Sequence, residues 1–170
     1  MNYLLQWDVH ATPIQRDAAF RRQFNACQGY LKLDMIDDAW AEIMEISALY
    51  QERPEVMQLK VWILMKKEDW KQALSTAEEL CQKTPQMAVP YLDAAYCLHE
   101  LKKTAAARKK LLSGPSALQH YPTYHYNLAC YEASLGYVDS ARHYLETAIL
   151  MNPKYSEEAR RDPDLKCLWG

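Results

Sequence analysis

Residues 122–155 read PTYHYNLACYEASLGYVDSARHYLETAILMNPKY, with one small residue, Ala129, twelve positions before another, Ala141. The second of these alanines recurs every 34 residues without insertion, at Ala39, Ala73, Ala107 and Ala141. A fixed period of this length is typical of proteins built from repeated structural units. The spacing therefore predicts a repeat architecture for most of the chain.

Compact or apolar residues surround each of these alanines at constant offsets. Twelve residues before it stand Cys27, Val61, Ala95 and Ala129. Nine before it stand Tyr30, Leu64, Leu98 and Glu132, six before it Leu33, Lys67, Leu101 and Leu135, and four after it Ile43, Ala77, Leu111 and Leu145. These offsets place apolar stripes on two successive helices joined by a short turn. Each unit is thus a helical hairpin, and stacking against neighbouring units buries its remaining apolar face.

The 34-residue unit resembles the tetratricopeptide repeat (TPR) family, which pairs a small residue in the first helix with an alanine in the second and often closes with proline. Pro85 and Pro153 close the second and fourth units in this way. The resemblance implies an all-α fold, a right-handed α-solenoid of four TPR hairpins. Its units span residues 20–53, 54–87, 88–121 and 122–155. A non-repetitive helical bundle with accidental alanine spacing is the alternative.

Two units depart from the pattern. In the third, Gly114 followed by Pro115 should end the second helix early. The first has Gln51 where a proline would close it. Thr12 followed by Pro13 is typical of a helix start, so we expect residues 1–19 to form a partly helical extension.

Residues 156–170 are predicted to form a C-terminal capping helix and tail. The helix begins near Ser156, with acidic residues in its first turn and arginines in its last. We expect Leu165, Leu168 and Trp169 to fold back on the fourth unit, because the end of a solenoid needs its apolar face covered. The alternative is that this tail docks on another protein.

In a TPR stack the first helix of each hairpin lines the concave surface, so the resemblance assigns a partner-binding groove. Its residues are Phe24, Gln28, Lys32, Gln58, Trp62, Lys66, Leu92, Tyr96, His99, Tyr126, Asn127 and Cys130. Aromatic anchors with a few polar neighbours suit an extended or helical peptide better than a strongly charged ligand. For each single residue, packing against the neighbouring repeat is the alternative.

Some TPR domains grip the acidic carboxyl terminus of heat-shock chaperones with lysine, arginine and asparagine. The matching positions here hold Phe24, Leu59, Val89 and Asp93. Apolar or acidic side chains cannot neutralise two carboxylates, so this class of partner is excluded.

The composition is that of an ordinary globular protein: 170 residues, of which 49% are hydrophobic and 25% charged. A net charge of -2 leaves no broad basic field for nucleic acid or a membrane surface. The short basic run at residues 108–110 is interpreted as a solvated helix face. Five cysteines without a CxxC pair argue against a disulfide framework or a zinc site and favour a reducing compartment. With no signal-peptide pattern and no run of membrane-spanning length, we expect a cytoplasmic protein.

Candidate catalytic or metal-binding groups are sparse. His125, His143 and Cys130 share the fourth hairpin, but the register puts His143 on the exposed side of the second helix. Cys97 and His99 point to different helix faces, which predicts a buried thiol and a solvated imidazole. The four glycines form no phosphate-binding loop. We therefore expect no catalytic residue, no cofactor and no bound metal.

These features predict a protein–protein interaction module, an adaptor or scaffold that captures a peptide or helix of a partner protein in its groove. Two other roles stay open. One is a chaperone similar to the small acidic ones of bacterial type III secretion, and the other is a structural protein that associates with itself along the solenoid axis. The oligomeric state, monomer or weak homo-oligomer, and the identity of the partner do not follow from the residues.

Overall fold

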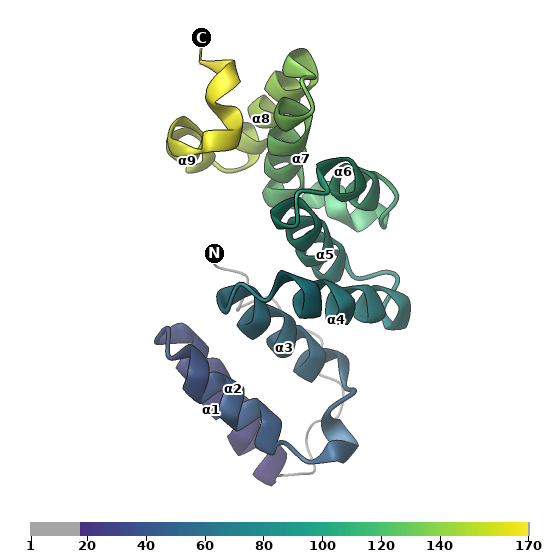
Figure 1. The fold of residues 1–170 in the computed structure, drawn as a ribbon, viewed down its shortest axis with the longest axis vertical. Helices are drawn as coiled ribbons and strands as arrows, with labels where there is room; N and C mark the ends of the chain where they lie inside the picture. The colour runs from purple at the N-terminus through teal and green to yellow at the C-terminus, as the bar shows by residue number, and fades with distance from the viewer. Residues whose placement is uncertain (1–17, 170) are drawn as a thin grey trace. The chain divides into compact units, whose positions relative to one another are not determined.

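The computed structural model describes residues 18–169, and this part of the chain is helical without a β-strand (Figure 1). The α-helices are α1 (Ala18–Lys32), α2 (Ile36–Glu45), α3 (Pro54–Lys66), α4 (Trp70–Lys83), α5 (Ala88–Glu100), α6 (Thr104–Leu112), α7 (Pro122–Ser134), α8 (Val138–Met151) and α9 (Tyr155–Arg161). Short 3-10 helices lie between or after them, η3 (Ala48–Tyr50), η4 (Ser116–His120) and η5 (Pro163–Leu168). The helix start expected at Thr12 and Pro13 lies outside the described residues.

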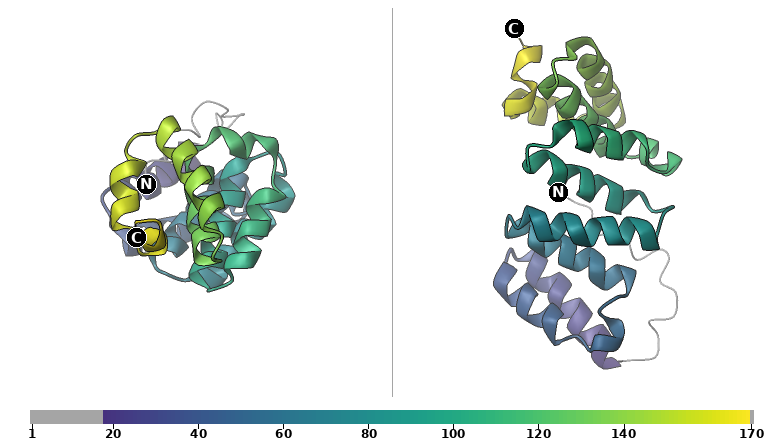
Figure 2. Two further views of the ribbon diagram at one scale, coloured as in Figure 1. Left: turned by 90° about the horizontal axis from the view of Figure 1, so that it is seen from above. Right: turned by 45° about the vertical axis from the view of Figure 1, so that its right-hand side comes forward.

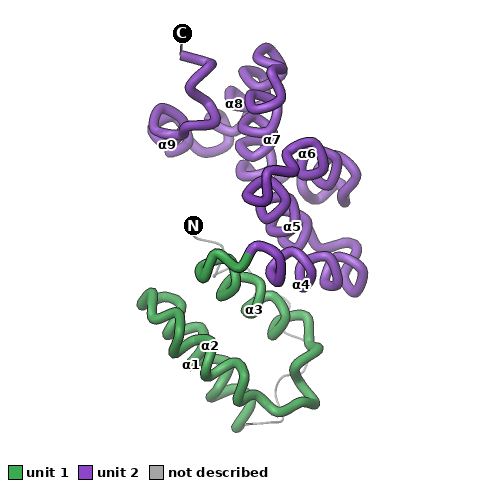
Figure 3. The backbone as a smooth tube through the Cα atoms, in the orientation of Figure 1, with its two compact units in different colours: residues 1–69 green, residues 70–170 purple. Residues whose placement is uncertain are grey.

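The chain divides into two compact units, residues 1–69 and residues 70–170 (Figure 3). In the first unit, Phe20, Ile43 and Ile63 belong to one buried apolar cluster on α1, α2 and α3. In the second unit, Leu128 and Leu145 belong to a larger cluster that α5 to η5 share. Each unit therefore has an apolar core of its own.

The small residues that define the sequence period are fully buried. The alanines at positions 39, 73, 107 and 141 are all 0% exposed, as are Cys27, Val61, Ala95 and Ala129. In the first hairpin the Cys27 thiol donates a hydrogen bond to the Ala39 carbonyl, 3.4 Å away, so the two helices are close at this point. Helix backbones can approach this closely only where side chains are short. The small residues therefore recur with the 34-residue period of the hairpins.

The turns inside the hairpins share one backbone geometry with the same 34-residue period. Asp34, Glu68, Lys102 and Gly136 have positive φ angles of 58°, 57°, 62° and 85°. In every turn the next residue donates its N–H to the carbonyl five residues back, as from Lys103 to Leu98 at 2.9 Å. This is the Schellman arrangement, which ends a helix with one left-handed residue, usually glycine. Glycine stands in the fourth turn alone, so the other three turns carry the geometry without the residue that signals it.

The left-handed conformation predicts a stabilising substitution at Lys102. A side chain there costs about 1–2 kcal/mol, because its Cβ approaches the following carbonyl oxygen. Lys102→Gly should therefore raise the free energy of unfolding by about 1 kcal/mol in urea denaturation. Lys109→Gly, at an exposed position within α6, is the control and should lower it by about 1 kcal/mol. Two variants that lose stability alike would contradict the turn geometry.

The expected early end of the second helix in the third unit is confirmed. Helix α6 ends at Leu112 after 9 residues, and η4 follows it. A Cβ on Gly114 would collide with Leu118 Cδ1 and lie 3.1 Å from Tyr91 Cδ1. Close packing of η4 against this turn therefore requires glycine.

One position of the predicted apolar stripe is wrong. Leu33 is 71% exposed, because α1 ends at Lys32 and Leu33 lies in the turn directly before the left-handed Asp34. The equivalent Leu101 and Leu135 are half-buried.

Glu132, the polar member of the stripe nine residues before the alanines, is buried at 1% exposure. Its carboxylate accepts a hydrogen bond from Arg108 Nε at 2.6 Å, which joins α7 to α6. Lys110 pairs with Glu78 at 3.5 Å. Two of the three cations of the basic run at residues 108–110 thus form ion pairs with neighbouring helices, while Lys109 is exposed as expected.

Breaking the Arg108–Glu132 pair should be strongly destabilising. Arg108→Ala leaves a buried carboxylate without its cation, and we expect a loss of about 3–5 kcal/mol of unfolding free energy. Replacing both residues with leucine should recover most of this loss, because an apolar pair removes the desolvated charge as well. Urea denaturation of the single and double variants tests this, and a double variant as unstable as the single one would contradict it.

Candidate functional site

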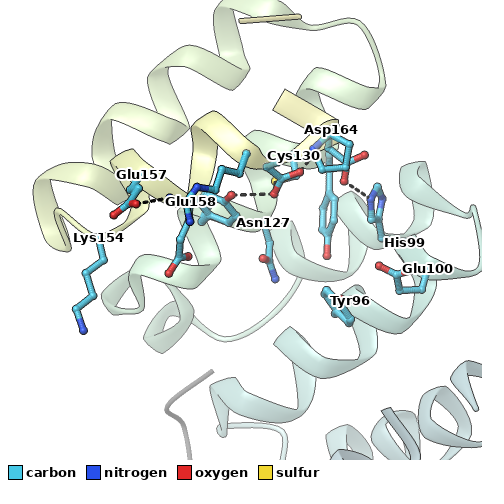
Figure 4. Close-up of a pocket in the computed structure, with 14 residues that line it drawn as sticks. Tyr96, His99, Glu100, Asn127, Cys130, Lys154, Glu157, Glu158 and Asp164 are labelled. Carbon is cyan, nitrogen blue, oxygen red and sulfur yellow. Dashed lines mark hydrogen bonds and ion pairs between the residues drawn. The ribbon is translucent and has the colours of Figure 1, made fainter. Parts of the chain in front are cut away.

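The second unit contains a cleft of about 830 Å³ bounded by α5, α7, α9 and η5 (Figure 4). Five residues assigned to the groove from the sequence line it: Tyr96, His99, Tyr126, Asn127 and Cys130. Tyr96 and Cys130 are one 34-residue period apart, so they occupy the same position on the first helices of successive hairpins. The repeat register therefore brings these side chains to one surface.

The other residues lining the cleft were not found by the repeat pattern. They are Glu100, Tyr131, Lys154, Glu157, Glu158, Arg161, Asp162, Pro163 and Asp164. Most of them belong to α9 and η5, which lie after the last repeat. The sequence feature that could have indicated these residues is Asp162-Pro163-Asp164, in which two carboxylates flank a helix-breaking proline.

The C-terminal segment enters the cleft through its two aspartates. The Asp162 side chain caps η5 by accepting the Asp164 N–H at 2.9 Å. Its other oxygen accepts a hydrogen bond from Tyr126 Oη at 2.8 Å and one from Cys130 Sγ at 3.7 Å. Two residues assigned to partner binding therefore bind the chain's own tail.

Asp164 holds the imidazole of His99. Its Oδ2 lies 2.8 Å from His99 Nε2, and Thr104 Oγ1 lies 3.0 Å from His99 Nδ1. The prediction of a solvated His99 imidazole is therefore wrong. The His99 side chain is 12% exposed, and both ring nitrogens have hydrogen-bond partners. Tertiary folding of the tail, which the helix register does not describe, causes the difference.

Two leucines anchor the tail in the core. Leu165 is 0% and Leu168 3% exposed, and both belong to the apolar cluster of α7 and α8. Trp169 is 51% exposed, with its Nε1 donating to the Ala159 carbonyl at 3.3 Å. Both views of Figure 2 show the yellow C-terminal segment beside the green α7–α8 hairpin. Leu165 and Leu168 thus fold back as expected, whereas Trp169 stays at the surface.

This anchoring predicts that the tail stabilises the fold. Leu165→Ala should lower the unfolding free energy by about 2–5 kcal/mol, because it opens a cavity in the core. Lys166→Ala, at the exposed neighbouring position, should change it by no more than about 0.5 kcal/mol. Deleting residues 163–170 should lower the melting temperature in circular dichroism. An unchanged melting temperature would favour the docking alternative for the tail.

Ring contacts fix the tyrosines of the cleft. Tyr126 stacks on Tyr155 with ring centroids 4.5 Å apart, and the Tyr155 hydroxyl hydrogen-bonds Thr123 Oγ1 at 2.7 Å. Tyr96 meets Trp70 edge-on at 5.8 Å. These contacts hold aromatic faces in place at the cleft before any ligand binds.

Burial raises the pKa of the tyrosine hydroxyls and of the Cys130 thiol in the cleft. Burial, followed by the charge of Glu100, raises the pKa of Tyr96 to about 12. Burial and then the hydrogen bond to Asp162 raise the pKa of Tyr126, and burial and the charge of Asp162 raise that of Cys130. A phenol or thiol of raised pKa stays protonated at neutral pH and is a poor nucleophile or base. These tyrosines and this thiol therefore offer hydrogen-bond donors to a bound molecule at neutral pH.

A possible metal-ligand grouping at the cleft is explained by hydrogen bonding. Ligand atoms of Cys130, Asp162 and Asp164 lie within 4.8 Å of one another. The contacts of these groups with Tyr126 and His99 already account for their proximity. The other candidate set also separates: His143 is exposed, while the His125 ring meets Tyr124 and Tyr144.

No protein-family model matches the chain, and no curated protein matches its sequence. Solved structures match its fold. MamA from residue 41 onward, from Desulfovibrio magneticus RS-1, has a TM-score of 0.71 at 16% identity, over 89% of this chain and 90% of MamA. The MamA RS-1 ArsTM double mutant gives the same TM-score and identity, over 89% of each chain.

The fold is a TPR-like helical solenoid. This confirms the fold class predicted from the sequence, and it rules out the alternative of an unrelated helical bundle. At 16% identity the likeness concerns the fold alone. No helix within residues 18–169 is long and apolar enough to cross a membrane.

Two of the predicted groove residues of this TPR-like fold are buried and do not line the cleft. Leu92 is 4% and Gln58 1% exposed, so both are interior residues rather than groove residues. Both lie one turn before an aromatic groove position and therefore on the same side of their helix as that position. The repeat register alone did not show that these two side chains would be covered.

The remaining predicted groove residues belong to the first unit. Phe24 and Trp62 are half-buried and pack against its apolar cluster. Gln28 is half-buried and Lys32 exposed. Lys66 is exposed and pairs with Asp34 at 2.7 Å. The predicted groove residues that line a common cleft are therefore those of the second unit.

Proposed function

We propose that this chain is a four-unit TPR protein that binds a segment of a partner protein in the cleft of its second unit. The proposed units are residues 20–53, 54–87, 88–121 and 122–155. Helices α3, α5 and α7 begin at the first residues of the last three, and the left-handed turns repeat with the same period. Adaptor and scaffold roles are the usual use of such surfaces, which are concave and rigid.

The observation that carries the proposal is a cleft with fixed aromatic walls. Tyr96 and Tyr126 are held by ring contacts, and rigid aromatic side chains are the commonest anchors of protein interfaces. The Asn127 side chain is half-buried beside them and is a further polar contact for a bound peptide. A helix or an extended segment fits a cleft of this kind.

We further propose a reducing, cytoplasmic location and a role without catalysis or cofactor. All five cysteines are free, and four of them are buried. Burial, as the first cause, raises the pKa of Cys27 and Cys97 to about 12 and that of Cys81 to about 11. Thiols of this kind are structural and unreactive.

Affinity capture from a native lysate tests the proposal. The parent chain should retain a protein that Asn127→Tyr loses, because the larger side chain fills the cleft. Arg142→Tyr, at an exposed position on α8 outside the cleft, is the control and should retain it. Circular dichroism verifies that all three chains fold alike.

The result that would contradict cleft binding is a partner held equally by both variants. Light scattering of the purified chain identifies a partner that is a second copy of the chain itself. A mass that rises with concentration in the parent and in Asn127→Tyr alike would replace cleft binding with self-association.

A further inference from the structure

The cleft carries more negative than positive charge. Five carboxylates line it, against one lysine and one arginine. Arg161 is paired with Glu157 at 2.6 Å, and Asp164 faces His99. Among residues 18–169, no cation forms an ion pair with Glu100, Glu158 or Asp162, and Lys154 is the remaining basic group of the lining (Figure 4). The cleft therefore attracts a cation and repels an anion.

A buried polar group in the cleft wall lacks a hydrogen bond. Tyr131 lines the cleft and is 1% exposed, and its hydroxyl has no partner among the described residues. Its ring lies 4.9 Å from the ring of His99. A buried hydroxyl without a partner destabilises the fold, because it has lost its hydrogen bonds to water. A fold keeps such a group at a cleft more readily when a bound molecule completes its hydrogen bonding.

The pKa shifts of the lining agree with a negative potential. Burial is the first cause of the raised pKa of Tyr96 and of Tyr131, and the charge of Glu100 comes next at Tyr96 and last at Tyr131. The charges of Asp162 and Glu158 contribute in the same way at Tyr126. Carboxylates of α5, of α9 and of the junction between α9 and η5 thus act on three tyrosines of the cleft lining.

Resting on the function proposed above, we infer that the cleft binds an arginine side chain in a basic segment of the partner protein. A guanidinium group is planar, carries donors only and stacks on aromatic faces. It can therefore pair with Glu100 or with Glu158, donate to the Tyr131 oxygen from the Glu100 side, and lie over the ring of Tyr96 or of Tyr126. A lysine offers the charge without the planar shape and binds more weakly. An acidic peptide or a nucleic acid meets repulsion.

Fluorescence polarisation with defined peptides tests this inference. The probe is a fluorescein-labelled 12-residue peptide of four Gly-Arg-Ala triplets, compared with versions in which citrulline, lysine or glutamate replaces arginine. Citrulline keeps the shape of arginine and removes its charge. The arginine peptide should bind at least about ten-fold more tightly than the citrulline and glutamate peptides, and its affinity should fall as salt rises.

Variants of the parent chain locate the binding. Glu100→Gln with Glu158→Gln should weaken the arginine peptide about ten-fold. Asp139→Asn with Glu146→Gln removes the same charge from exposed positions on α8, and it should leave the affinity within about two-fold. Tyr131→Phe should weaken binding several-fold while the melting temperature stays equal or rises. A purely structural role for the hydroxyl would not lower the affinity.

Citrulline or glutamate peptides that bind as tightly as the arginine peptide would overturn the charge inference and leave peptide binding standing. The charge inference is also overturned if Asp139→Asn with Glu146→Gln weakens binding as much as Glu100→Gln with Glu158→Gln. If no peptide binds while the lysate partner is still lost with Asn127→Tyr, the arginine inference fails and the proposed function survives. If no peptide binds and Asn127→Tyr also retains the lysate partner, the arginine inference and the proposed function both fail.

Discussion

Within each compact unit, paired helices such as α1 and α2, α5 and α6, and α7 and α8 pack against each other at small, buried residues, and the other features follow from that approach. The residues of the two 34-residue series are all fully buried. A larger side chain at such a point would force the helices apart, because packed interiors have little free volume. The left-handed turn a few residues away then reverses the chain with the same geometry each time. Together the crossing and the turn determine which side of α5 and of α7 meets the core and which side faces the cleft.

The C-terminal segment completes this site instead of merely ending the chain. Leu165 and Leu168 enter the core, and this anchoring places Asp162 and Asp164 against groups of α5 and α7. The polar atoms of Tyr126 and His99 that bind these aspartates are therefore occupied within the fold. The available surface is what remains around them, chiefly the rings, Asn127 and the carboxylates that the tail and α9 contribute.

Charge in this unit is used in two distinct ways. At Glu132 a carboxylate is buried and matched by Arg108, which joins two helices. Around the cleft several carboxylates stay without a cation among the described residues and coincide with fixed aromatic rings. Paired charge inside the fold serves packing, whereas unpaired charge at a cleft creates a field that selects a ligand.

The sequence by itself determined the repeat period, the helical hairpins and the early end of α6, because small residues, apolar stripes and a Gly-Pro pair act locally. It also assigned five of the residues that line the cleft, since a helix position recurs with the period. The three left-handed turns at Asp34, Glu68 and Lys102 were hidden, because the usual glycine is missing there. Only the tertiary structure decided that the tail enters the cleft, that Leu92 and Gln58 are buried, and that carboxylates of α9 line the same cleft as Glu100 of α5. These outcomes depend on contacts between segments up to 65 residues apart, and no local pattern encodes which of two helix faces such a distant segment will cover.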